Sequence, residues 1–184
     1  AGIRAQDDKL LQKTFSLMRE NLFGAHGYGL NSLGTQESVE ALAVDDLRAF
    51  HAQLAVPNNA VIAVFGDMDS AQVRADLETA FGLWKRGGDY QVPKLLTGTQ
   101  GKRRVADQKD KEQAVAVLGF HGCTFFDEDR YALELLGEAC SDLGSRLFMR
   151  IREELGLAYY VGAQSQPGMT PGSFSFYAGT SPEQ

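Results

Sequence analysis

The side chains best suited to metal or acid–base chemistry in this sequence are its three histidines, His26, His51 and His121. None of them has a second His or a Glu at the spacing that places two ligands on one face of a helix. The sequence also lacks a G-x-S-x-G turn, a Walker loop and a dinucleotide fingerprint. We therefore expect these residues to form no metal site and no cofactor site, and we interpret each His as a packed or solvated side chain.

The most informative segment runs from Ser145 to Val161 and reads SRLFMRIREELGLAYYV. Its pattern predicts a helix that ends at Gly156, a residue suited to a left-handed C-terminal cap, and then a strand. Arg152 falls late in the helix and Tyr159 follows seven residues later. This segment resembles the helix-to-strand signature in the C-terminal domains of the pitrilysin/insulinase-like zinc metallopeptidases, or inverzincins, a family that includes mitochondrial processing peptidase.

Further motifs agree with this resemblance in their order along the chain. LFGAHGYG at 22–29 is similar to the loop after the family's first long helices, with Gly27 in place of the usual Pro. DDLRAFH at 45–51, PNN at 57–59 and VFGDMD at 64–69 resemble the helix, turn and strand that close the family's first αβ domain. The similarity covers about residues 10–178, and it implies a fragment that spans the end of one αβ domain and the start of the next.

The resemblance assigns a catalytic role to Arg152 and Tyr159, which match the family's Arg and Tyr positions. Attack on a peptide carbonyl builds negative charge on its oxygen, and a guanidinium or a phenol directed at that oxygen stabilises the transition state. In the alternative interpretation, Arg152 is a solvated cation at the helix end beside Glu153 and Glu154, and Tyr159 is a half-buried strand aromatic. Tyr160, on the other strand face, is the natural control.

The family binds Zn²⁺ through an H-x-x-E-H helix and a distant Glu, both upstream of the region matched here. The resemblance therefore implies zinc in a parent protein and none in this chain. It predicts a fragment of a metalloendopeptidase that hydrolyses peptides or unfolded polypeptides in a closed chamber, and that is inactive alone. The alternatives are a non-catalytic binding or structural subunit of a peptidase-like dimer, and an unrelated αβ binding domain.

The expected partners are a peptide substrate and either the remainder of the parent chain or a metal-bearing partner subunit, with a homo-oligomer as a further option.

A net charge of -6, with Lys102–Arg104 as the one basic run, argues against binding to nucleic acid. No apolar stretch approaches the ~20 residues that span a bilayer. Cys123 and Cys140 are interpreted as ordinary thiols. We expect the bacterial periplasm or cytoplasm, with the mitochondrial matrix as the alternative.

Several secondary-structure elements must position these residues. Apolar periodicity and capping residues predict helices over 7–23, 38–42 and 45–54, a helix capped by Ser70, a helix over 127–140 and a helix from Ser145. Strands are predicted over 60–65, covered on both faces, and over 114–120, with a β-hairpin over 159–176. The predicted fold class is α+β, with two αβ portions, mainly antiparallel sheets and helices packed on one face. The predicted domains are 1–86 and 111–184, joined by a linker over 87–110.

Overall fold

The computed structural model describes residues 2–3, 9–24, 27–91 and 101–183, so His26 and part of the predicted linker lie outside the described residues. The sheet strands are β1 (Ala114–His121), β2 (Tyr160–Gln166) and β3 (Ser173–Thr180). The helical elements are α2 (Leu10–Phe23), η1 (Gly27–Gly29), α3 (Gln36–Glu40), α4 (Val44–Leu54), η2 (Pro57–Asn59), α5 (Ser70–Phe81), α6 (Arg130–Ser141) and the π-helical η3 (Phe148–Glu154).

The chain divides into two compact units, and one of them combines two segments that are separate in the sequence. Unit 1 combines Ala1–Gln36 with Lys94–Gln184, and unit 2 is Glu37–Pro93. The N-terminal segment joins the C-terminal one because α2 packs against β1. The division predicted from the sequence, with domains 1–86 and 111–184, concerns the parent protein's domains and stays a prediction.

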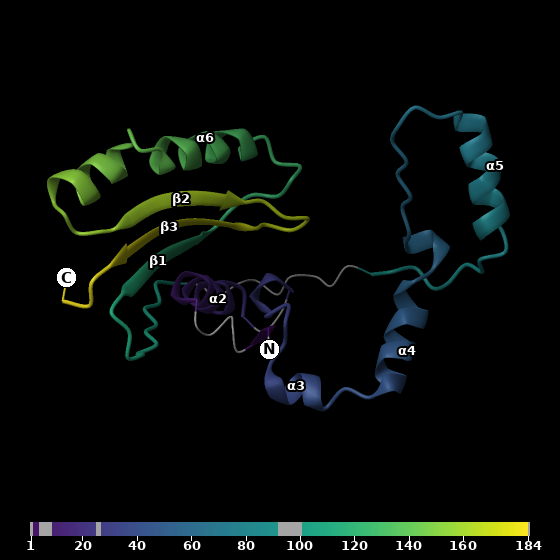
Figure 1. The fold of residues 1–184 in the computed structure, drawn as a ribbon, viewed down its shortest axis with the longest axis horizontal. Helices are drawn as coiled ribbons and strands as arrows, with labels where there is room; N and C mark the ends of the chain where they lie inside the picture. The colour runs from purple at the N-terminus through teal and green to yellow at the C-terminus, as the bar shows by residue number, and fades with distance from the viewer. Residues whose placement is uncertain (1, 4–8, 25–26, 92–100, 184) are drawn as a thin grey trace. The chain divides into compact units, whose positions relative to one another are not determined.

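Unit 1 is built around a three-stranded antiparallel sheet in the order β1-β3-β2 (Figure 1). Its register places Val117 beside Tyr177 and Tyr177 beside Gly162. The predicted C-terminal hairpin is confirmed, since β2 and β3 pair directly. The α+β class is confirmed as well, because these antiparallel strands occur together with helices that are separate along the chain.

Helix α2 packs on the sheet through its aromatic side chains. The Phe15 ring meets the Tyr177 ring edge to face at 5.7 Å, and the Phe23 ring meets His121 at 5.5 Å. Such edge-to-face pairs add to the free energy of burying the rings. At Gly119 the backbone of β1 lies so close to Met18 that a Cβ would come within 2.4 Å of the sulfur. Glycine at this position therefore permits close packing of α2 on β1.

Helix α6 lies along β2, where it covers backbone groups at the outer edge of the sheet. The Ser141 hydroxyl donates to the Ala163 carbonyl at 2.6 Å and accepts from the Ala163 N–H at 3.0 Å. An open strand edge is a template for pairing with another chain. This one serine satisfies both polar groups of Ala163, so α6 protects that part of the edge.

The core of unit 1 gathers where the sheet, α2 and the β2–β3 turn meet. Phe174 is 4% exposed and its ring meets Phe176 edge to face at 5.2 Å. Tyr28 lies beside this core, because its hydroxyl accepts the Met169 N–H at 2.9 Å. The other buried apolar residues of unit 1 are Phe15, Phe23, Cys123, Ala158, Val161 and Ala163.

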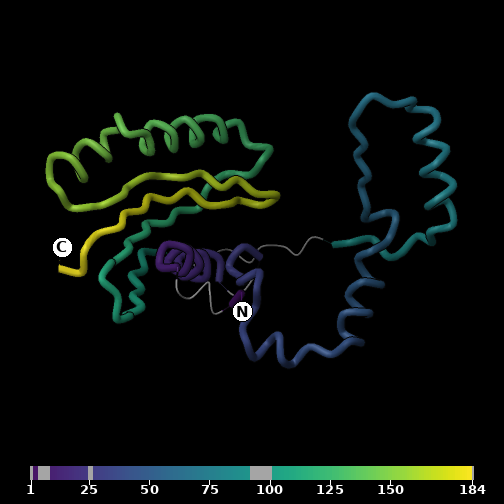
Figure 2. The backbone as a smooth tube through the Cα atoms, viewed as in Figure 1, coloured from purple at the N-terminus to yellow at the C-terminus, as the bar shows by residue number. Residues whose placement is uncertain are grey.

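The prediction of a buried strand over Ala60–Phe65 is wrong for this chain. The segment is extended, but it forms no ladder, and Val61 and Phe65 are 95% and 91% exposed. Figure 2 shows it running alongside α5 within unit 2. The physical reason is the absence of a partner, since the described residues of unit 2 contain no strand. An apolar run can predict a strand, but a strand needs a partner strand to pair its backbone and layers on the faces of the sheet to bury its side chains.

Helix α5 begins one residue away from the prediction. The sequence suggested Ser70 as its cap, whereas the Asp69 carboxylate accepts from the N–H groups of Ala71 and Gln72. Asp satisfies the free N–H groups of a first turn and also favours the positive end of the helix dipole.

Across the described part of the chain, no helix combines the length and the apolar character that a membrane crossing requires.

Candidate functional site

The helix that carries Arg152 starts where the sequence predicts. Ser145 is buried, and its hydroxyl accepts the N–H of Phe148 at 3.1 Å and donates to the Cys140 carbonyl at 3.2 Å. A serine in this position satisfies N–H groups that have no partner inside the helix. The cap therefore ties the start of the Arg152 helix to the end of α6.

The same helix departs from the predicted α-helical form. Residues Phe148–Glu154 are π-helical, and the Leu155 N–H reaches back five residues to the Arg150 carbonyl at 3.2 Å. Gly156 then takes a φ of +61°, which is the left-handed region that favours glycine. Its N–H donates to the Arg152 carbonyl at 3.2 Å. The predicted stop at Gly156 is confirmed, and the backbone of Arg152 is held at the helix end.

The Arg152 side chain is 44% exposed and has two neighbours. Its guanidinium carbon lies 4.8 Å from the centroid of the Phe148 ring, and its Nε lies 3.8 Å from a Glu153 carboxylate oxygen. An exposed ion pair at that separation adds little stability. The stacking on Phe148 was missed from the sequence, although the spacing of four residues on one helix could have indicated it.

Tyr159 lies immediately before β2, and its backbone continues the pairing of the sheet. Its N–H donates to the Gly179 carbonyl at 2.8 Å, while its side chain is 57% exposed. Thr180 supports the preceding turn, because its hydroxyl donates to the Leu157 carbonyl. The backbone of Tyr159 is thus fixed, and its phenol is available to a ligand.

Tyr160 differs from its neighbour in its surroundings. Its ring lies against Gly179, where a Cβ would come within 2.2 Å of it, and 6.4 Å from the Tyr177 ring. Burial, and to a lesser extent the Tyr177 phenol, raises the pKa of Tyr160 above its ordinary value. Because the folded state favours the neutral phenol, this contribution to stability is present at neutral pH and is lost as the pH rises through the raised pKa.

The structure therefore places Arg152 and Tyr159 on the two sides of one helix-to-strand turn. Both side chains are exposed, whereas Ala158, between them, is buried at 8% exposure. The turn presents two donors, a guanidinium and a phenol, that suit a carbonyl or carboxylate oxygen. From the sequence we also expect both side chains to point into a common solvent-reachable groove, and this stays a prediction.

The residues that the structure describes do not form a zinc site. Among the described residues, no three His, Cys, Asp or Glu side chains come together in a group that could hold a metal ion. A zinc site needs three or four such ligands around one point. His121 instead lies against the Phe23 ring.

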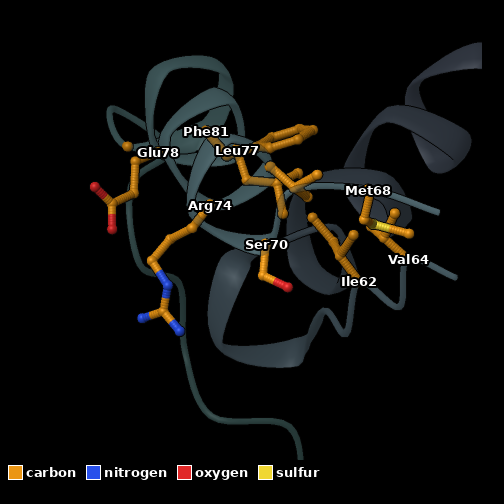
Figure 3. A pocket seen from close by; sticks show the side chains of 10 residues that line it. Ile62, Val64, Met68, Ser70, Arg74, Leu77, Glu78 and Phe81 are labelled. Atoms are coloured by element: carbon orange, nitrogen blue, oxygen red, sulfur yellow. The ribbon is translucent and has the colours of Figure 1, made fainter. Parts of the chain in front are cut away.

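Unit 2 contains an apolar hollow of about 560 Å³ between the extended segment and α5. Figure 3 shows Ile62, Val64 and Met68 on one side of it and Leu77 and Phe81 on the other. Ile62 and Val64 belong to the segment that was predicted to be a strand covered on both faces, and here they line an open surface. Its polar and charged lining side chains are Ser70, Arg74 and Glu78, and neither Arg152 nor Tyr159 lines it.

Sequence relatives place these observations in a family. The family model described as the peptidase M16 inactive domain matches residues 41–184. The chain is 32% identical over 178 residues to an uncharacterized zinc protease of Streptomyces coelicolor, covering 91% of this chain and 38% of that protein. It is 35% identical over 165 residues to an uncharacterized zinc protease of Mycobacterium leprae, covering 88% and 37%. This chain thus spans less than half the length of these relatives.

The fold has a counterpart among solved structures. The crystal structure of a peptidase M16 inactive domain from Pseudomonas fluorescens superposes with a TM-score of 0.85 at 24% identity, covering 100% of this chain and 45% of that one. The match to the family model extends over most of the sequence, including the segment that carries Arg152 and Tyr159. The predicted resemblance to the pitrilysin/insulinase-like peptidases is confirmed, and the chain belongs to the peptidase M16 family.

Proposed function

We propose that this chain is the substrate-binding part of a zinc-dependent metalloendopeptidase that hydrolyses peptides or unfolded polypeptides in a closed chamber. The parent protein is the longer polypeptide, or the complex with a metal-bearing subunit, that supplies the zinc site. The observation that carries the proposal is the turn between η3 and β2, which exposes Arg152 and Tyr159 while its backbone is held by hydrogen bonds.

In this proposal both side chains donate to the carbonyl oxygen of the peptide bond that is cleaved. Addition of a nucleophile to that carbonyl moves negative charge onto its oxygen, and fixed donors stabilise this charge more than they stabilise the neutral substrate. The guanidinium offers a planar set of N–H donors. The phenol donates one directed hydrogen bond, so its loss should affect catalysis more than folding.

Exposed apolar side chains in each unit support assembly with the remainder of the parent protein. In unit 2, Val61 and Phe65 project from an unpaired strand-like segment, and the hollow beside α5 is apolar. In unit 1, Leu118 and Phe120 on β1 are at least half exposed. Apolar patches of this kind in a protein commonly mark interaction surfaces. A second copy of the chain is the alternative partner for these surfaces.

A second candidate is a non-catalytic subunit that binds substrate or serves as a structural half of a peptidase-like dimer. It is favoured by the description of the matching family model as an inactive domain. The two candidates differ in where the metal site lies. An H-x-x-E-H motif in the same polypeptide supports the first, and its presence only in a partner subunit supports the second.

The proposal is tested by comparing the 184-residue chain with its parent. We expect the chain alone to retain no stoichiometric zinc after dialysis and to leave a quenched peptide intact, because the described residues form no group of three metal-binding side chains. The parent should bind zinc and hydrolyse the peptide. Elemental analysis and fluorescence measure the two properties. Tightly held zinc in the chain alone, or a zinc-loaded parent without any hydrolysis, would contradict the enzymatic proposal.

A further inference from the structure

The contact between Arg152 and Phe148 is the feature of the site that the proposed function leaves unexplained. The guanidinium carbon lies 4.8 Å from the ring centroid, within the range of a cation–π interaction. Phe148 is half-buried and so has less freedom than the exposed Arg152. The ring is therefore the more fixed of the two partners, and the guanidinium adapts to it.

Phe148 and Arg152 lie four positions apart on the π-helical η3. Two residues at this spacing are neighbours on one face of a helix. A second pair with the same spacing, Arg150 and Glu154, forms an ion pair on this helix. π-helical turns are rare and occur frequently at functional sites. Arg152 thus meets Phe148 across one turn of a helix whose form is typical of functional sites.

The contact with the ring leaves the N–H donors of the guanidinium available. An aromatic ring restricts the rotamers of a long side chain, but it is not a conventional hydrogen-bond acceptor that would occupy those donors. The neighbouring Glu153, at 3.8 Å from Nε, is too distant for a hydrogen bond. The guanidinium can therefore donate to a ligand while it stays in contact with the ring.

We propose that Phe148 is a positioning residue that holds the Arg152 guanidinium ready for the substrate carbonyl. This inference rests on the proposed function, because it presupposes that Arg152 contacts substrate. It adds a residue that acts through Arg152 and does not itself touch the reacting atoms. Its physical basis is preorganisation, since a side chain already in place loses less freedom when the substrate binds.

The first experiment uses the 184-residue chain and requires no activity. Side-chain protons of Arg152 should show an upfield ring-current shift in NMR spectra. The shift should disappear in Phe148→Leu, which keeps apolar bulk, and persist in Phe148→Trp. Phe126→Leu is the matched control, because Phe126 is 76% exposed, and it should leave the Arg152 signals unchanged. Absence of the shift in the unmodified chain would overturn the inference.

The second experiment measures kcat/KM in the zinc-loaded parent. Phe148→Leu should lower it roughly threefold, the scale of an exposed cation–π contact, and Phe148→Trp should retain it. In an Arg152→Gln parent, Phe148→Leu should have no further effect, because the ring acts through the guanidinium. Thermal unfolding of each variant separates this coupling from a general loss of stability.

The outcomes distinguish a failure of the positioning role of Phe148 from a failure of the proposed substrate contact of Arg152. If Arg152→Gln lowers activity but Phe148→Leu does not, the positioning role is wrong and the proposed function stands. If Phe148→Leu lowers activity equally with and without Arg152, Phe148 acts on the fold and the inference is also overturned. If Arg152→Gln has no effect on hydrolysis, the proposed substrate contact fails, and the positioning role fails with it.

Discussion

Replacing Tyr159 by Phe in the zinc-loaded parent should lower kcat/KM by roughly 10²-fold, the scale on which removal of one oxyanion donor acts. The substitution removes a single hydroxyl from a side chain that is 57% exposed, and the backbone hydrogen bond to Gly179 does not depend on it. Steady-state hydrolysis of a quenched peptide measures the effect. The melting temperature should hardly change, because little buried contact is lost.

Two companion variants make this result specific. Tyr160→Phe removes a hydroxyl from the adjacent ring, which packs against Gly179, and should keep kcat/KM within a few-fold of the parent. Arg152→Lys should be damaging, since an ammonium lacks the planar donors of a guanidinium. Full activity in both Tyr159→Phe and Arg152→Lys would show that the turn is an ordinary surface and would refute the proposed role.

Phe174→Ala should destabilise unit 1 by about 3–5 kcal/mol, the usual cost of removing a large aromatic ring from a core. Phe174 is 4% exposed, lies on the central strand β3 and packs its ring on Phe176. The loss combines transfer of the ring to water with the cavity left behind. The expected result is a markedly lower denaturant midpoint for the near-ultraviolet signal of the aromatic residues.

The matched control for this prediction is Phe126→Ala. Phe126 carries the same ring but is 76% exposed, so its removal should change stability by less than about 0.5 kcal/mol. If Phe174→Ala and Phe126→Ala unfold at the same denaturant concentration, the ring of Phe174 does not lie in a cooperative core. The description of β3 as the centre of unit 1 would then be wrong.

Local sequence predicted the elements around the candidate site well. Ser145 and Gly156 were expected to begin and end a helix, and both do so through short-range hydrogen bonds or a positive φ. The hairpin of β2 and β3 followed from alternating side chains on either side of a Pro/Gly turn. These features depend on residues close together in the chain, so their signals are present in the sequence itself.

The identities of Arg152 and Tyr159 as candidates came from the resemblance to a family, since spacing alone is equally typical of a solvated helix end. The contact of Arg152 with Phe148 was missed although their spacing could have indicated it, and the π-helical form of the turn was not foreseen. A local pattern of apolar and charged residues does not distinguish a π-turn from an α-turn. That choice depends on the strain and packing of the whole segment.

The sequence by itself determined which segments are helical or extended, since capping, glycine positions and apolar periodicity act over a few residues. Only the tertiary structure decided what each segment contacts. It brought α2 onto the sheet of unit 1, where Phe15 meets Tyr177 across 162 positions of the chain, and it left Ala60–Phe65 without a partner strand. The reason is that the burial of a side chain depends on the segment that packs against it. The local sequence of an apolar run does not specify that segment.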